Sequence, residues 1–446
     1  MNSCKDVIEN DFCIGCGVCT IKNPESVPIF NENGFLVPKA APIKVMEIDA
    51  SKICPFSNKG KDETELADYF FSDAKYKHDT LGRYQRLNIA SIKDEQERME
   101  SSSGGILTTV NKHLLREGIV DAVITVGQNK GEKLFSYQVC SDPEQLHKFA
   151  KSKYYPIEIG SILSEIMDDD KKYAIVALPC VTKALRNLQL NEPALQRKFP
   201  FISTLICGHL KSKYYADFIG WQAGIKPGDL KSIDFRVKNP SATANCYSIR
   251  VTSISEDKLL EHSSIKYNDW GVGFFKPKSC DFCDDVFGEL GDISVGDAWL
   301  PKYTKDYRGN SLLVIRSKLA EKLFDNNASE YIFHEIDTKE AVDTQRGGVN
   351  HKRRGIIERI DVQAREAKPV PKKRSFIHLR GAMTENERLK ARLRTALREK
   401  GELAYKDALK QSRLNVFYET VNSLVENYYL ITIPTWKRIV KRLLGR

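Results

Sequence analysis

Residues 173–180 read Tyr-Ala-Ile-Val-Ala-Leu-Pro-Cys, a short apolar run that ends in a proline and a cysteine. The run predicts a buried β-strand over 173–178. Similar runs occupy 121–126 and 201–206, and helical patterns lie between them. Alternating strands and helices predict an α/β layer with a largely parallel sheet.

Small residues introduce one of the helical patterns. Ser101-Ser-Ser-Gly-Gly105 leads into an apolar-periodic stretch over 106–116, which ends before Gly118. A small-residue entry and a glycine exit are typical of helix ends. Residues 230–320 are richer in strand patterns, which lie at 233–237, 247–253, 293–295 and 311–315, and they indicate a second lobe.

Composition divides the 446 residues into five segments. Residues 1–60 are rich in Cys, Gly and Pro, which suits a small ferredoxin-like module held together by a metal centre. We predict a linker with one short helix over 61–85, and two lobes of a mixed α/β domain over 86–200 and 201–365. A basic helical tail follows over 366–446, so the class is α/β, or α+β for the whole chain.

The composition excludes several classes of protein. Hydrophobic residues make up 41% and charged residues 29%, which is ordinary for a globular chain. No stretch approaches the ~18 uninterrupted apolar residues of a membrane-spanning helix, and residues 1–6 lack a hydrophobic signal region. Eleven cysteines without an export signal favour metal binding or redox chemistry over disulfides. We therefore predict a cytoplasmic protein.

Positive charge is concentrated at one end of the chain. The net charge is +10, yet residues 366–446 hold 19 Lys and Arg against 8 Asp and Glu, and the rest of the chain carries −1. A neutral body with a basic tail does not indicate a nucleic-acid-binding protein, so we predict no nucleic-acid partner.

Three cysteines follow one another at two-residue gaps, with a glycine in each gap: Cys13, Cys16 and Cys19, with Gly15 and Gly17. Three thiolates at this spacing can wrap one corner of a 4Fe-4S cluster, and the glycines let the backbone turn tightly. Cys54 precedes Pro55, like the Cys-Pro pair that closes ferredoxin motifs, and is the candidate fourth ligand. A structural zinc site is the alternative, although zinc usually takes its ligands in two separated pairs.

A second set of four cysteines is scattered over the body of the chain: Cys180, Cys207, Cys280 and Cys283. Two of them directly follow predicted strands, and the other two form a Cys-x-x-Cys pair. Ligand sites gather at the carboxyl ends of strands in open α/β sheets, so these thiols fit a second 4Fe-4S cluster. The alternatives are small buried hydrophobes at the strand ends and a zinc-binding or redox-active pair. We assign no role to Cys4, Cys140 and Cys246.

The chain resembles the coenzyme F420 hydrogenase/dehydrogenase beta-subunit family from about residue 10 to about residue 360. The motifs that carry this resemblance occur in the family's order: Ser103-Gly104-Gly105, Gly118-Ile-Val-Asp121, Lys151-Ser-Lys-Tyr154, Leu178-Pro-Cys180, Cys280-Asp-Phe-Cys283 and Asp292-Ile-Ser-Val-Gly-Asp297-Ala-Trp299. The chain is similar to the 7-hydroxymethyl chlorophyll a reductase branch, which carries an N-terminal 4Fe-4S module.

The resemblance implies an FAD-binding iron–sulfur oxidoreductase, with a flavin domain beside the second cluster. A chain of outer cluster, inner cluster, flavin and substrate would convert single electrons into a two-electron reaction. One motif departs from the family, because Cys207-Gly208-His209 stands where relatives often carry Cys-His-Gly. Residues 366–446 have no counterpart that we can identify.

The flavin needs a site for its pyrophosphate. Ser102, Ser103, Gly104 and Gly105 precede the helix at 106, where backbone N–H groups and the helix dipole favour an anion. An ordinary helix start is the alternative. Lys153 and Tyr154 offer a charge and a stacking face, or else belong to a solvated surface. The candidates for catalysis are His209 as a proton donor and Asp297 in the cleft. Their alternatives are a structural histidine and a carboxylate that caps its own turn.

The basic tail contains two helical patterns. Thr384-x-x-Glu387 is a capping box that predicts a charged helix to about Arg398. Residues 435–446 place Trp436, Ile439, Val440, Leu443 and Leu444 on one face of a basic helix. Such a helix either contacts an anionic membrane surface at the inner face of the membrane or docks on the protein body.

We predict an iron–sulfur flavoprotein that passes electrons from a ferredoxin-type donor through two 4Fe-4S clusters to FAD and on to an organic substrate. The substrate is a small molecule or, if the tail meets a membrane, a lipid-linked intermediate of cell-surface polysaccharide assembly. The first alternative is a coenzyme F420-dependent beta subunit of a larger complex. The second, from another class, is a zinc-stabilised protein that binds nucleic acid or a protein partner.

Overall fold

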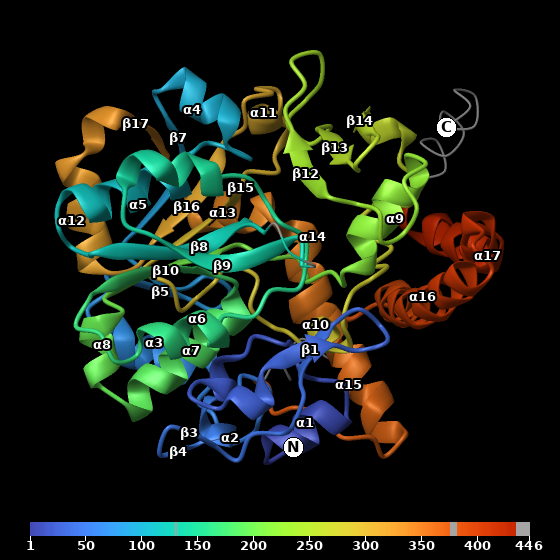
Figure 1. Cartoon of the computed structure of the whole chain (residues 1–446), viewed down its shortest axis with the longest axis horizontal. Helices are drawn as coiled ribbons and strands as arrows, with labels where there is room; N and C mark the ends of the chain where they lie inside the picture. Colours follow the sequence, from blue (N-terminus) through green and yellow to red (C-terminus); the bar gives the residue numbers. More distant parts are fainter. Residues whose placement is uncertain (130, 132, 375–380, 434–446) are drawn as a thin grey trace.

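The computed structural model describes all residues except 130, 132, 375–380 and 434–446. One eight-stranded sheet forms its centre (Figure 1), in the order β17-β7-β16-β15-β11-β10-β8-β9. Its strands are β7 (Arg86–Ile92), β8 (Ala122–Gln128), β9 (Phe135–Cys140), β10 (Tyr173–Ala177), β11 (Phe201–Leu205), β15 (Ile293–Asp297), β16 (Ser311–Ile315) and β17 (Tyr331–Glu335). The neighbours β8, β10, β11 and β15 run parallel, and the pairs toward both edges are antiparallel. The predicted α/β class is confirmed.

Helices cover both faces of this sheet. Residues 93–231 contain the helices and turns α4 (Glu95–Glu100), α5 (Ile106–Arg116), η3 (Pro143–Phe149), α6 (Gly160–Ile166), α7 (Pro179–Asn191), α8 (Ala194–Lys198) and α9 (Tyr214–Gln222). In Figure 1, α5 and α12 (Lys318–Asn326) lie above the sheet, and α6, α7 and α8 lie below it.

Strand β10 shows why the apolar runs are continuous. Ala174 and Val176 face the core under α5 and α12, whereas Tyr173, Ile175 and Ala177 face the core against α6 and α7. Successive side chains of a strand point to opposite faces, so a strand covered on both sides is apolar throughout.

The predicted boundary at residue 200 falls between two neighbouring strands of the sheet. β10 and β11 pair in parallel, with Ala174 opposite Phe201. Residues 86–200 and 201–365 therefore share one sheet instead of forming two lobes, because the strand–helix alternation continues across the boundary.

The N-terminal segment packs under α6 and α7. Its elements are α1 (Cys4–Glu9), η1 (Val18–Thr20), η2 (Pro24–Ser26), β1 (Pro28–Phe30), β2 (Leu36–Pro38), β3 (Lys44–Val45), β4 (Ile48–Asp49) and α2 (Ala50–Ile53). Val18, Ile21 and Ile53 share one apolar core with Leu185 of α7. The short helix predicted in the linker is α3 (Glu63–Phe70), which precedes the hairpin of β5 (Tyr76–His78) and β6 (Gly82–Tyr84).

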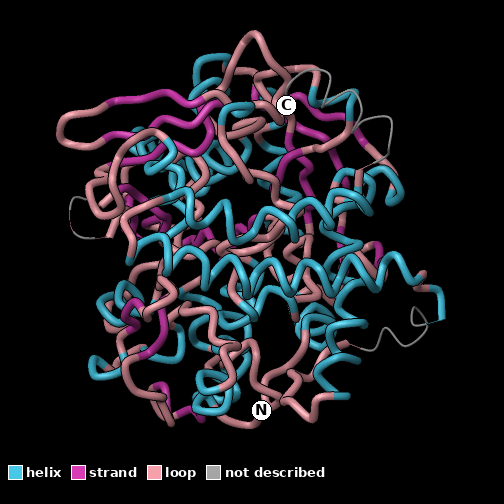
Figure 2. Tube along the Cα trace, turned by 90° about the vertical axis from the view of Figure 1, so that its right-hand side faces the viewer, coloured by secondary structure: helices cyan, strands magenta, loops and turns pink. Residues whose placement is uncertain are grey.

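A second layer stands beside the central sheet. It holds a three-stranded antiparallel sheet of β12 (Ser232–Val237), β13 (Ser248–Thr252) and β14 (Asp257–Leu260), together with α9, α16 (Glu385–Lys410) and α17 (Leu414–Thr432). Phe218, Phe235, Phe274, Tyr405 and Phe417 lie in one core that joins these elements. Figure 2 shows α16 and α17 as two long helices side by side across this face.

The described part of the basic tail is therefore a docked pair of helices. The capping box of Thr384 and Glu387 is present, but the helix runs beyond Arg398 to Lys410. Gly401 lies inside this helix and does not end it. A side chain has no room there, because a Cβ would lie only 2.4 Å from the ring of Phe274. The amphipathic pattern of 435–446 lies outside the described residues.

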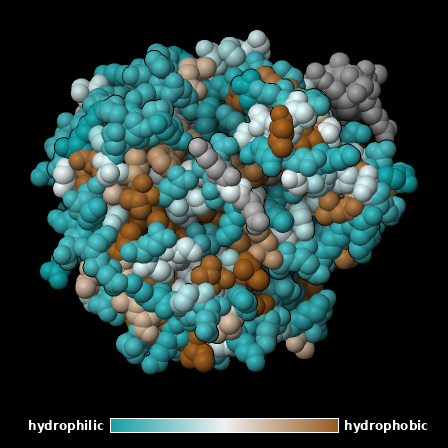
Figure 3. Space-filling view, in the orientation of Figure 1, coloured by the Kyte–Doolittle hydropathy of each residue, from teal (hydrophilic) through white to brown (hydrophobic). Residues whose placement is uncertain are grey.

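The remaining elements lie between β14 and α16 along the chain. They are η4 (His262–Ser264), α10 (Lys278–Asp281), α11 (Pro301–Thr304), η5 (Ala328–Glu330), α13 (Thr338–Thr344), α14 (Arg346–Val349), the π-helical turn η6 (Asn350–Arg354) and α15 (Gly355–Arg365). Among the described helices, none is both long and apolar enough to cross a membrane. The face seen in Figure 3 is mainly hydrophilic, with apolar side chains in separate patches.

Candidate functional site

Cys13, Cys16, Cys19 and Cys54 line one small cavity in the N-terminal segment, and we call them the outer group. Gly15 and Gly17 have φ values of +66° and +75°, as the predicted tight turns require. The Gly15 N–H donates to the Cys13 sulfur at 3.4 Å. Backbone N–H groups of Val18, Phe56 and Ser57 donate to other sulfurs of the group.

Burial raises the pKa of the Cys13 thiol to about 12, and the thiols of the outer group raise one another's pKa further. Thiolates in such a place need a compensating cation, which a bound metal supplies. The N–H donors and the cavity fit thiolate ligands of an iron–sulfur cluster. Within the described residues, no three His, Cys, Asp or Glu side chains are placed to hold a single metal ion.

Cys4 is a fifth cysteine of this region, and the sequence analysis gave it no role. It lies in α1 and is buried. Its thiol is hydrogen-bonded to the thiols of Cys19 and Cys54. No spacing rule links residue 4 to the Cys13 motif. The capping box of Ser3 and Asp6 starts α1, and it is the one local signal in the sequence for the helix that carries Cys4.

The structure also brings the four scattered cysteines together, and we call them the inner group. Cys207, Cys280 and Cys283 all lie close enough to Cys180 to raise its pKa, after burial itself. Burial also raises the pKa of Cys207 to about 11 and of Cys280 to about 12. The Leu210 N–H donates to the Cys280 sulfur at 3.3 Å.

The fold explains this convergence. Cys180 lies in the first turn of α7, directly after β10, and Cys207 follows β11, which pairs with β10. The Cys207 N–H donates to the Val286 carbonyl at 3.0 Å, which ties the strand end to the segment that carries Cys280 and Cys283. The carboxyl ends of two parallel strands thus meet the Cys-x-x-Cys pair.

The two groups are neighbours. Cys16 of the outer group lies close enough to Cys180 to raise its pKa. Tyr137 of β9 is near both, and its pKa is raised by burial and then by Cys180 and Cys16. Adjacent cysteine groups are the arrangement that electron transfer between two clusters requires.

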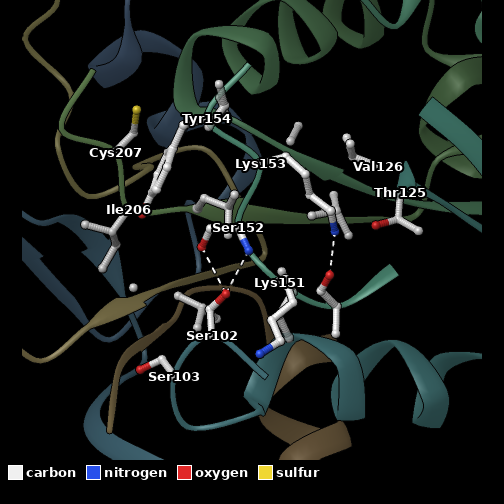
Figure 4. A pocket seen from close by; sticks show the side chains of 18 of the residues that line it. Ser102, Ser103, Thr125, Val126, Lys151, Ser152, Lys153, Tyr154, Ile206 and Cys207 are labelled. Atoms are coloured by element: carbon white, nitrogen blue, oxygen red, sulfur yellow. Dashed lines mark hydrogen bonds between the residues drawn. The ribbon is translucent and has the colours of Figure 1, made fainter. Parts of the chain in front are cut away.

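A cavity of about 270 Å³ opens at the carboxyl ends of β8, β10, β11 and β15 (Figure 4). The predicted site residues that line it are Ser102, Ser103, Gly105, Lys153, Tyr154, Cys207, His209 and Asp297. Gly104 lies behind the wall, where its N–H donates to the Ser311 hydroxyl at 3.1 Å and a Cβ would stand 2.5 Å from the Ala90 carbonyl oxygen. The sequence prediction therefore assembled residues of one pocket.

The N-terminus of α5 faces this pocket. Gly105 precedes the helix with φ +84° and no side chain caps it, so the N–H groups of the first turn, at 106–108, are open to a ligand. Ser102 is held nearby, because its hydroxyl accepts from the Ser152 N–H at 2.7 Å (Figure 4). Free N–H groups and the helix dipole favour a phosphate at this end of the pocket.

Lys153 and Tyr154 belong to the pocket wall. The Lys153 ammonium donates to the carbonyl of Ala150 at 2.6 Å, and burial lowers its pKa to about 7. The ring of Tyr154 meets Trp270 edge-on, with the centroids 4.9 Å apart. Both residues are half-buried, and their role in binding stays a prediction.

Asp297 does not cap its own turn. It lies at the end of β15 and binds the guanidinium of Arg236 through two hydrogen bonds of 2.8 and 3.0 Å. Arg236 also donates to the Ser102 carbonyl at 3.1 Å, so the pair ties the second layer to the pocket entrance. Sequence reasoning missed Arg236, since nothing in the chain relates it to a carboxylate 61 residues away.

His209 packs against Trp270, with ring centroids 4.4 Å apart, and its Nε2 has no hydrogen-bond partner among the described residues. Burial lowers its pKa far below the usual range, and Lys211, Lys276 and Arg394 lower it further. The imidazole is therefore neutral near pH 7, and the role of His209 as a proton donor stays a prediction.

The site therefore combines a mixed α/β sheet with two groups of buried and half-buried cysteines beside a pocket. Residues 89–164 match the family model for the coenzyme F420 hydrogenase/dehydrogenase beta subunit N-terminus, and residues 170–340 match that for its C-terminus. The chain belongs to this family.

Individual relatives are distant. A coenzyme F420-dependent sulfite reductase of Methanocaldococcus jannaschii is 25% identical over 334 residues, which are 71% of this chain and only 46% of that protein. A coenzyme F420 hydrogenase subunit beta of Methanococcus voltae is 22% identical over 300 residues, or 64% of this chain and 93% of that one. A solved chain of the F420-reducing [NiFe] hydrogenase complex of Methanosarcina barkeri is 18% identical with a TM-score of 0.49, and covers 64% of this chain and 95% of its own.

Proposed function

We propose that this chain is an iron–sulfur flavoprotein that moves electrons from the outer group, through the inner group, to FAD in the pocket. The outer group, Cys13, Cys16, Cys19 and Cys54, would hold one 4Fe-4S cluster. The inner group, Cys180, Cys207, Cys280 and Cys283, would hold another. The observation that carries the proposal is the order of the groups: Cys16 and Cys180 belong to one apolar core and interact electrostatically, and Cys207 of the inner group lines the pocket.

The bound groups would supply the redox chemistry, since clusters carry single electrons and a flavin exchanges one or two. The chain's own residues would bind and orient them. The first turn of α5 and the Ser102 region would hold the pyrophosphate through N–H groups. Tyr154 and Trp270 offer aromatic faces, and the neutral His209 offers a hydrogen-bond donor or acceptor deeper in the pocket.

The molecule that exchanges electrons with the flavin is a separate part of the proposal. The names of the relatives support coenzyme F420 as the molecule that exchanges a hydride with the flavin, within a larger complex. A ferredoxin-type donor and an organic substrate are the other candidate. The lipid-linked substrate and the membrane surface depend on residues 435–446, so truncation at residue 433 and liposome flotation would test them.

The experiment is anaerobic purification of the full chain with analysis of iron, sulfide and flavin. We expect about eight irons, as two 4Fe-4S clusters contain, and one FAD per chain. A colourless protein that contains zinc and no flavin would contradict the proposal. With the loaded protein, reduction of the flavin by reduced F420 or by reduced ferredoxin would distinguish the two partners.

A further inference from the structure

Lys352 is a buried lysine beside the inner group. It belongs to the π-helical turn η6, which interrupts the helical segment between α14 and α15. π-Helical turns are rare in proteins, and those that occur often lie at functional sites. Only 1% of Lys352 is exposed, so its ammonium is removed from water.

The ammonium of Lys352 is aimed at sulfur. It donates to the Cys283 Sγ at 3.3 Å and to the Asp285 carbonyl at 2.7 Å. It is also near enough to Cys207 and Cys280 to act on both thiols electrostatically. One cation therefore faces three of the four cysteines in the inner group.

Several other buried cations near the inner group have carboxylate partners. Lys276 and Arg398 both pair with Asp281, and Arg374 pairs with Glu289. Lys352 forms no ion pair with a carboxylate among the described residues, and its two hydrogen bonds go to a sulfur and a backbone carbonyl. A buried ammonium is costly unless an anion compensates it. The groups that act on Lys352 electrostatically are the thiols of Cys283, Cys207 and Cys280 and, after them, the carboxyl of Asp285.

We propose that Lys352 is a fixed positive charge that raises the reduction potential of the inner cluster relative to the outer one. This inference rests on the proposed function, because it requires a cluster at the inner group. Reduction adds one electron, supplied from the outer group, and so one unit of negative charge. A cation held against a ligand sulfur stabilises the reduced form more than the oxidised form, without breaking a bond or moving a proton. Lys352 thus acts through the inner cluster: the higher reduction potential favours electron transfer from the outer group to the inner group, which lies beside the pocket.

The test is a redox titration of the purified full chain, monitored by electron paramagnetic resonance. Lys352→Met removes the charge and keeps the length of the side chain. We expect the ratio of reduced to oxidised inner cluster at a fixed solution potential to fall about tenfold, which is about 59 mV for a one-electron couple. Lys352→Arg keeps the charge and should stay close to wild type. The inner signal is identified as the one that Cys283→Ser abolishes.

Lys112→Met is the matched control, since Lys112 is also buried but pairs with Glu97 on the α5 side of the sheet. The reduction potential of the inner cluster in this variant should equal that of wild type. If the methionine variant loses iron, Lys352→Gln, which is neutral but still donates a hydrogen bond, is expected to show the same fall. Equal potentials in iron-loaded wild type and neutral variants would overturn the inference. A wild-type chain without iron at the inner group would instead overturn the proposed function.

Discussion

The outer and inner groups contain the same number of predicted ligands, yet they are built differently. The outer group is assembled from two short stretches of a small segment, and its sulfurs accept from backbone N–H groups. The inner group is assembled from two strand ends and a Cys-x-x-Cys pair, and a buried lysine donates to it. The first site therefore draws its cysteines from the first 54 residues, whereas the second draws them from positions between 180 and 283 that the sheet brings together.

The largest expected effect is a selective loss of iron. Cys13→Ser should remove about four of about eight irons, as one 4Fe-4S cluster contains, and leave the inner group loaded. Cys280→Ser should remove the other half. Iron analysis checks both, with Cys246→Ser as the control that keeps all the iron. Loss of all iron in either variant would mean that the two groups are not separate sites.

The buried ion pairs around the inner group give the next effect. Asp281 lies between the two cysteines of the pair and binds Lys276, Arg359 and Arg398. Asp281→Asn leaves buried cations unpaired, so we expect a loss of about 3–5 kcal/mol in the free energy of unfolding. Urea unfolding measures it. The exposed pair of Asp257 and Arg250 is the control, where Asp257→Asn should lower the free energy of unfolding by at most about 1 kcal/mol. Equal losses in the two variants would contradict the claim that burial makes the Asp281 pairs more important for stability.

A pH effect should appear at the pocket beside the inner group. Burial lowers the pKa of Lys153 to about 7, whereas in the unfolded chain it is about 10.4. Between these values the unfolded state binds the extra proton, so stability rises with pH, by at most about 1.4 kcal/mol per unit. Below pH 7 the contribution to stability no longer changes. Urea unfolding at pH 7, 8 and 9 should give a shallower slope for Lys153→Met than for wild type; identical slopes would contradict the burial of the ammonium.

The smallest effect concerns the fifth thiol. Cys4→Ala removes hydrogen bonds to Cys19 and Cys54 but no charge. We expect a shift of less than tenfold in the reduced-to-oxidised ratio of the outer cluster, in the titration used for Lys352. Cys140→Ala, another buried cysteine, should have no effect. A shift in the inner cluster alone would contradict the position of Cys4 at the outer group.

The same contrast explains what could be predicted. The outer motif and the strands that flank Cys180 and Cys207 follow from local spacing and apolar runs. The carboxyl-end rule for parallel strands predicted that Cys180 and Cys207 lie close together, and the serine–glycine entry predicted residues that line the pocket. Arg236, Lys352 and Cys4 were missed, because each acts through a contact distant in sequence or through an element without a motif. The boundary at residue 200 failed for the same reason, since strand pairing is not local.

The most direct test of the account is a crystal structure of the anaerobically purified chain with anomalous diffraction collected at the iron edge. We predict two separate iron peaks, one enclosed by Cys13, Cys16, Cys19 and Cys54 and the other by Cys180, Cys207, Cys280 and Cys283. A single peak, or a peak bound by any other set of residues, would contradict the account.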